Sequence, residues 1–138
     1  MKRILLNMLL LILGTVTAMA QEKFNPEKIK AEVHSTITAE AKLTKEEAAA
    51  FFPLFDAMKE KQRALYRQQK EIGKQTPTTD AACRKAIERR DMLQKEMQTV
   101  EQSYHQKMMK VVAPAKVYKA LEADRRCKRN AFKKAVRK

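Results

Sequence analysis

Basic side chains near the C-terminal end are the residues of this chain best suited to chemistry, and that chemistry is the binding of anions. Between residues 116 and 138 there are ten lysines and arginines and only two acidic residues. The whole chain carries a formal net charge of +14, so much of its excess positive charge lies in this one stretch. The candidate contact residues are Arg125, Arg126, Lys128, Arg129, Lys133 and Lys134.

Two interpretations of the basic stretch are open. It is either a solvated face that keeps the protein soluble or a working surface for an anionic partner, since so many like charges repel one another unless acid, solvent or a polyanion surrounds them. The partners that fit are acidic stretches of unfolded protein, anionic lipid and lipopolysaccharide. Nucleic acid is not expected, because the N-terminal residues predict export.

Catalytic and metal-binding constellations are not evident. The two histidines, His34 and His105, lie in different predicted helices, and neither has a histidine or cysteine four residues away. Clustered ligands of that kind are what a zinc site needs, so no metal site is predicted, and a soft-metal site of His105 with Met109 is the minor alternative. In the helix predicted over about residues 79–112, acidic residues alternate with basic ones at the spacing of surface ion pairs. We therefore expect neither an enzyme nor a cofactor.

Cys83 and Cys127 are the only two cysteines, and such a pair in an exported protein suggests a disulfide. If the last two helices form a hairpin that turns near Ala113, the helical rise places these cysteines about 24 Å apart. A disulfide tolerates at most about 7 Å between Cα atoms. The alternatives are an intermolecular bridge, two free thiols or a different arrangement of the helices.

The elements that position these side chains are predicted to be helices. Lys, Glu, Gln, Ala and Met are frequent, Trp is absent and the chain has only two glycines, a composition that favours helices over sheets. We predict an all-α fold of four helices in a single domain over residues 21–138, after a signal peptide over residues 1–20.

Two long helices, about residues 45–73 and 79–112, are predicted to form an antiparallel hairpin. Thr44 and Glu47 have the spacing of a capping box at the start of the first, with Leu43 as a hydrophobic staple. Apolar residues then recur at helical spacing on both helices. They are Phe51, Phe55, Met58, Leu65 and Ile72 on the first helix and Leu93, Met97, Val100, Tyr104, Met108 and Val111 on the second.

A shorter helix flanks this hairpin on each side. Asn25 and Pro26 predict the start of the N-terminal helix, whose apolar stripe is Ile29, Val33 and Ile37. Pro114 opens the basic C-terminal helix, whose sparse apolar line is Val117, Leu121, Ala131 and Val136. Because this line is sparse, we expect the C-terminal helix to pack weakly and to leave its basic face exposed.

The N-terminal end predicts export. Two basic residues precede an apolar run over residues 4–13, and the small residues Ala18 and Ala20 stand just before Gln21. This order is typical of a secretory signal peptide that is cleaved before Gln21. The apolar run covers about ten residues, whereas a membrane-spanning helix needs about twenty. We expect the mature protein to be exported and soluble.

An exported, wholly helical chain with a cap of the Leu-Thr-x-x-Gln type resembles the Spy/CpxP family of periplasmic proteins. The cap reads Leu43-Thr44-Lys45-Glu46-Glu47 here, with Glu in the place of Gln, and that change preserves the capping chemistry. The second copy of the motif is degenerate. It reads Val112-Ala113-Pro114-Ala115-Lys116, which keeps the hydrophobic residue but loses both Thr and Gln.

The resemblance implies a periplasmic, ATP-independent chaperone of envelope stress that is a homodimer and holds unfolded or partly folded proteins on a positively charged face. In this role the six basic residues near the C-terminal end would contact clients. Two alternatives belong to other classes. One is a regulatory or metal-sensing accessory subunit, and the other is a binder of anionic lipid or lipopolysaccharide through the basic C-terminal helix.

Overall fold

The computed structural model of the protein describes residues 25–137, which form four α-helices and no strand. The helices are α2 (Pro26–Ala41), α3 (Lys45–Lys74), α4 (Asp80–Val111) and α5 (Pro114–Val136). The predicted all-α class is confirmed, and the two long helices agree with their predicted spans to within one residue. The predicted cleavage site at Ala18, Ala20 and Gln21 lies outside the described residues.

Two compact units divide the chain, with the boundary after Ser35. Of the first unit, the structure describes the beginning of α2. There the Asn25 side-chain oxygen accepts hydrogen bonds from the backbone N–H groups of Glu27 (3.1 Å) and Lys28 (3.4 Å), as the predicted cap requires. Ile29 of the predicted apolar stripe is 56% exposed.

The second unit, residues 36–138, contains the end of α2 and the other three helices. Ile37 is fully buried there, so it is the member of the α2 stripe that enters the core. Lys42 ends α2 in a left-handed conformation (φ 53°), and the Leu43 N–H donates to the Thr38 carbonyl at 3.1 Å. This is a Schellman termination in which lysine occupies the position that glycine usually takes.

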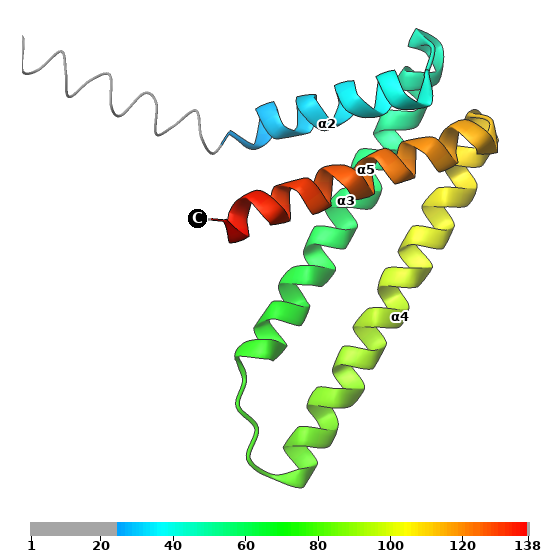
Figure 1. Ribbon diagram of the computed structural model, residues 1–138. Coiled ribbons are helices and arrows are strands. Elements are labelled where there is room, and N and C mark those ends of the chain that lie inside the picture. Colours follow the sequence, from blue (N-terminus) through cyan, green and yellow to red (C-terminus); the bar gives the residue numbers. More distant parts are fainter. Residues whose placement is uncertain (1–24, 138) are drawn as a thin grey trace, which may run out of the picture. The chain divides into compact units, whose positions relative to one another are not determined.

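Within this unit, α3 and α4 run antiparallel side by side and form the predicted hairpin (Figure 1). Leu65 and Ile72 of α3 pack with Leu93 and Met97 of α4 in one buried cluster. All five predicted apolar positions of α3 are buried, which confirms its stripe.

The apolar stripe of α4 departs from the prediction at its end. Val111 is 45% exposed, and Val112 takes the buried place. The reason is that α4 ends at Val111, and Val112 has an extended backbone that redirects its side chain. Val100 is half-buried and packs against the edge of the cluster.

Helix α5 turns back after Ala113 and crosses α3, which differs from the hairpin of α4 with α5 considered above (Figure 1). Its buried side is made of Val117, the acidic Asp124 and two small residues, Ala120 and Ala123, which allow close approach of the backbones. The predicted apolar line is therefore wrong beyond Val117 and the half-buried Leu121. Ala131 and Val136 are exposed because they lie past the crossing.

Candidate functional site

The predicted capping box at the start of α3 is present. The Thr44 hydroxyl oxygen accepts a hydrogen bond from the Glu47 N–H at 3.1 Å, and Glu47 Oε2 accepts one from the Thr44 N–H at 2.9 Å. Leu43 is buried, as expected for a residue that holds the entry of the chain into the helix. These three residues have a structural role at a junction of helices.

Lys116 adds a third connection to this junction, which the sequence did not predict. Its Nζ donates to the Lys42 carbonyl oxygen at 2.9 Å and to Glu47 Oε2 at 2.7 Å. The pKa of Glu47 is lowered below its usual value, mainly by the hydrogen bond from Lys116 and to a smaller extent by the one from the Thr44 N–H. Lys116 therefore links the first turn of α5 to both the end of α2 and the start of α3.

Three of the six predicted contact residues form ion pairs within the fold. Arg125 pairs with Glu122 on its own helix at 2.8 Å, and Arg126 pairs with Glu40 at the end of α2. Lys128 lies 3.5 Å from Asp124 Oδ2. Because these charges have acidic partners within the fold, they are less available to an external anion than the sequence suggested.

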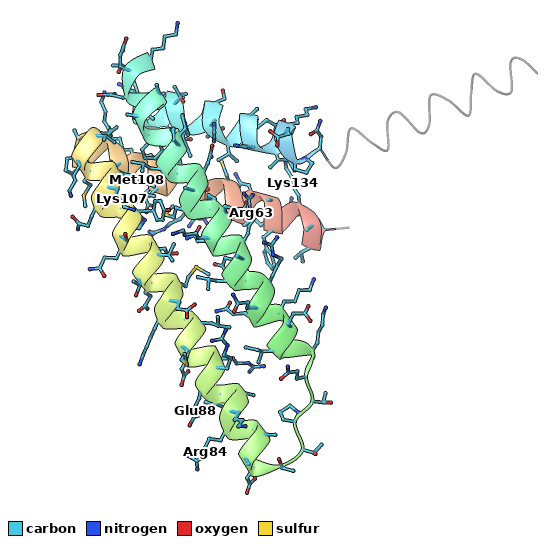
Figure 2. All side chains as sticks on the ribbon, turned by 180° about the vertical axis from the view of Figure 1, so that it is seen from behind. Arg63, Arg84, Glu88, Lys107, Met108 and Lys134 are labelled. Carbon is cyan, nitrogen blue, oxygen red and sulfur yellow. The ribbon has the colours of Figure 1, made fainter. Side chains whose placement is uncertain are left out.

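The other three predicted contact residues, Arg129, Lys133 and Lys134, lie beyond the crossing with α3. We call residues 129–136 the distal segment of α5. All of its residues are exposed, and no ion pair with the described residues involves these three cations. Figure 2 shows Lys134 on the part of α5 that extends past α3. The crossing thus divides the six basic residues into three with acidic partners and three without an ion-pair partner among the described residues.

A buried ion pair holds the middle of α5 against α3. Asp124 is only 7% exposed, and its Oδ2 accepts a hydrogen bond from Lys59 Nζ at 2.6 Å. Burial lowers the pKa of Lys59 from its usual 10.5 to about 8, although the hydrogen bond to Asp124 acts in the opposite direction. Burial also acts to lower the pKa of Lys128, but its interactions with Lys59 and Asp124 raise that pKa above its usual value.

A shallow open groove of about 450 Å³ lies between α3 and α4. Ala64, Leu65 and Val100 supply apolar surface, and the lysines Lys61 and Lys95 stand at its rim, with Thr99 and Glu96 completing the lining. The Lys61 ammonium also lies 5.4 Å from the centre of the Tyr104 ring, within range of a cation–π contact. Sequence periodicity placed the apolar residues in the seam but did not show that part of the seam is open.

Large apolar side chains are exposed elsewhere on the same hairpin. Tyr66 of α3 is 54% exposed, and Ile87 and Met92 of α4 are 60% and 53% exposed. Single exposed apolar residues are ordinary on protein surfaces. Together with the groove, however, they give the hairpin apolar contact points along much of its length.

Metal-ligating side chains do not gather in the described part of the chain. Within residues 25–137, no three His, Cys, Asp or Glu side chains lie close enough to hold a metal ion. His105 and Met109 lie on one side of α4, among glutamines and Glu101. Cys83 and Cys127 are both free thiols, and Cys83 Sγ lies 3.6 Å from the Pro77 carbonyl oxygen.

No helix within residues 25–137 combines the length and the apolar content that a membrane span requires. In comparisons with known proteins, no family model, curated protein or solved structure matches this chain.

Proposed function

We propose that this protein is an ATP-independent chaperone that holds non-native proteins in the periplasm. The observation that carries the proposal is the open groove between α3 and α4, with its apolar floor and lysine rim. A non-native protein exposes apolar segments together with charged ones, and the groove offers a counterpart to both. The resemblance to the Spy/CpxP family at Leu43, Thr44 and Glu47 and the predicted signal peptide support the same function and location.

The physical basis of holding is weak, adaptable contact. Lys61 and Lys95 can cover apolar client surface with their methylene stems while their ammonium groups remain hydrated. The exposed Met92 adds a flexible apolar side chain that adjusts to irregular surfaces. Because the groove is shallow, many different segments fit it equally well, and no energy source is needed to release them. In a homodimer, two such grooves would be available to one client.

An aggregation assay with rim variants tests the proposal. We expect the full chain to suppress the aggregation of an acidic, chemically unfolded model protein. Replacing both rim lysines (Lys61→Glu with Lys95→Glu) should remove most of this activity, because the rim then repels acidic segments. The matched control is Lys70→Glu with Lys85→Glu, which changes the net charge equally at exposed positions of the same two helices.

The outcomes distinguish the proposed function from its alternatives. If the rim variant suppresses aggregation as well as the parent while circular dichroism shows an intact fold, the groove is not the holding site. If the parent itself fails to suppress aggregation, the regulatory accessory subunit becomes the better hypothesis. Location is tested separately by the intact mass of the natively expressed protein, which we expect to begin at Gln21.

A further inference from the structure

The distal segment of α5, residues 129–136, is a helical surface without a partner in the described part of the fold. Phe132 is 70% exposed and Val136 is 68% exposed, although most large apolar residues of the second unit are buried. The crossing with α3 ends near Cys127, which is half-buried, and every described residue after it is exposed.

The side chains of the distal segment are sorted by type around the helix. At 3.6 residues per turn, Ala131, Phe132, Ala135 and Val136 fall within an arc of about 140°. The cations Arg129 and Lys133 lie beyond one edge of this arc, and Lys134 lies beyond the other edge. No acidic residue follows Asp124 in the sequence. The distal segment is therefore a basic amphipathic helix.

We propose that the distal segment binds in the plane of a bilayer surface rich in anionic phospholipid. Phe132 and Val136 would enter the boundary between headgroups and acyl chains, and the cations at the edges would contact lipid phosphates. Basic amphipathic helices bind such surfaces through buried apolar area together with attraction to anionic lipid. Long cationic side chains suit these edges, because their stems follow the apolar phase while their charges stay at the headgroups.

Charge complementarity selects this occupant. A second copy of the chain would bring the same cations to the contact, so like charges would oppose self-association. An acidic disordered polypeptide would satisfy the cations but offers no continuous apolar phase for Phe132 and Val136. An anionic bilayer supplies both negative charge for the cations and an apolar phase for Phe132 and Val136 along the whole segment. This inference goes beyond the proposed function and uses none of the residues that line the groove between α3 and α4.

Because the chain contains no tryptophan, a single introduced tryptophan is a direct fluorescent probe of its own position. Phe132→Trp places a single indole in the apolar arc, and its emission should shift to shorter wavelength with mixed phosphatidylglycerol–phosphatidylcholine vesicles. Vesicles of phosphatidylcholine alone should produce little shift. The matched control is Tyr118→Trp, because Tyr118 has nearly the same exposure (67%) on the same helix but lies in its first turns. No shift is expected there.

Charge reversal in the Phe132→Trp background tests the role of the cations. The variant Arg129→Glu with Lys133→Glu and Lys134→Glu should bind the anionic vesicles at least about a hundred-fold more weakly, from about five-fold for each cation near the surface. The matched control reverses Lys70, Arg84 and Lys85, which carry the same total charge on the hairpin and should change affinity only a few-fold. The same loss should appear for the Phe132→Trp variant with all of its cations intact when the salt concentration is high.

Several results would overturn the proposal. One is the lack of a shift at position 132 with anionic vesicles, and another is an equal shift at position 118, which would mean adsorption of the whole chain. A shift that grows with protein concentration without vesicles would assign the arc to a second copy. An equal shift with polyglutamate would assign it to acidic polypeptide.

A second variant keeps the proposal testable if charge reversal unfolds the chain. Val136→Asp keeps every cation and should still weaken vesicle binding about ten-fold, because it places a carboxylate in the apolar arc. Unchanged vesicle binding by this variant would contradict the proposal.

Discussion

Removal of the Asp124 carboxylate should destabilise the fold more than removal of its partner Lys59. Asp124→Leu leaves Lys59 and Lys128 facing each other at a site where Lys59 is only 18% exposed in its side chain. Breaking a buried pair by removing one member typically costs 3 to 5 kcal/mol, because the other charge is left uncompensated. We expect about 3 kcal/mol here, since Lys128 can move into solvent.

Lys59→Met should cost only about 1 kcal/mol, because Lys128 remains 3.5 Å from Asp124 and continues to compensate it. The lowered pKa of Lys59 leads to the same expectation, since burial disfavours its ammonium more than Asp124 favours it. The double variant should also cost about 1 kcal/mol, which gives a coupling energy of about 3 kcal/mol. Urea unfolding followed by far-ultraviolet circular dichroism at pH 7 measures all three values. Additive losses, or an unchanged Asp124→Leu variant, would refute this account of the pair.

The same residue predicts a pH dependence of defined sign. The pKa of Lys59 is about 8 in the folded chain and near 10.5 when unfolded, so between these values the unfolded chain binds more protons. The contribution of Lys59 to the free energy of unfolding therefore rises as pH increases from 8 to 10.5, and it is lost as pH falls through this window. The stability of the parent should increase relative to Lys59→Met over that range. A constant or decreasing difference would contradict the assignment.

Three further predictions concern the helix junction and the cysteines. Thr44→Ala should lower the free energy of unfolding by about 1 kcal/mol in urea, because it removes one half of the capping box; an unchanged midpoint would mean that the cap is not needed. Lys116→Met should raise the pKa of Glu47 towards 4.5 in a carboxyl NMR titration, because the hydrogen bond from Lys116 is the largest cause of the lowered pKa. Thiol titration of the native monomer should find Cys83 and Cys127 reactive, because one lies at the loop end of α4 and the other where α5 crosses α3. A Cys83–Cys127 link in unreduced peptide maps would contradict this arrangement.

What the sequence determined by itself is local in origin. The caps at Asn25 and Thr44 involve partners within three residues, so their residue types alone specify where α2 and α3 begin. The apolar spacing from Phe51 to Ile72 likewise placed the buried face of α3, because helical periodicity repeats within one or two turns. These local features are sufficient to predict the all-α class and the hairpin without knowledge of any tertiary contact.

What only the tertiary structure decided depends on where α5 crosses α3. The local sequence around Asp124 predicts an exposed acidic residue. The crossing nevertheless buries Asp124 beside Lys59, which is 65 residues away in the sequence. Lys116 reaches Glu47 across 69 residues in the same way. The crossing also separates the basic residues of α5 that have acidic partners from Arg129, Lys133 and Lys134, which form no ion pair with the described residues. Its position follows from the close fit of small residues and ion pairs between distant helices, and no periodic pattern within one helix encodes that fit.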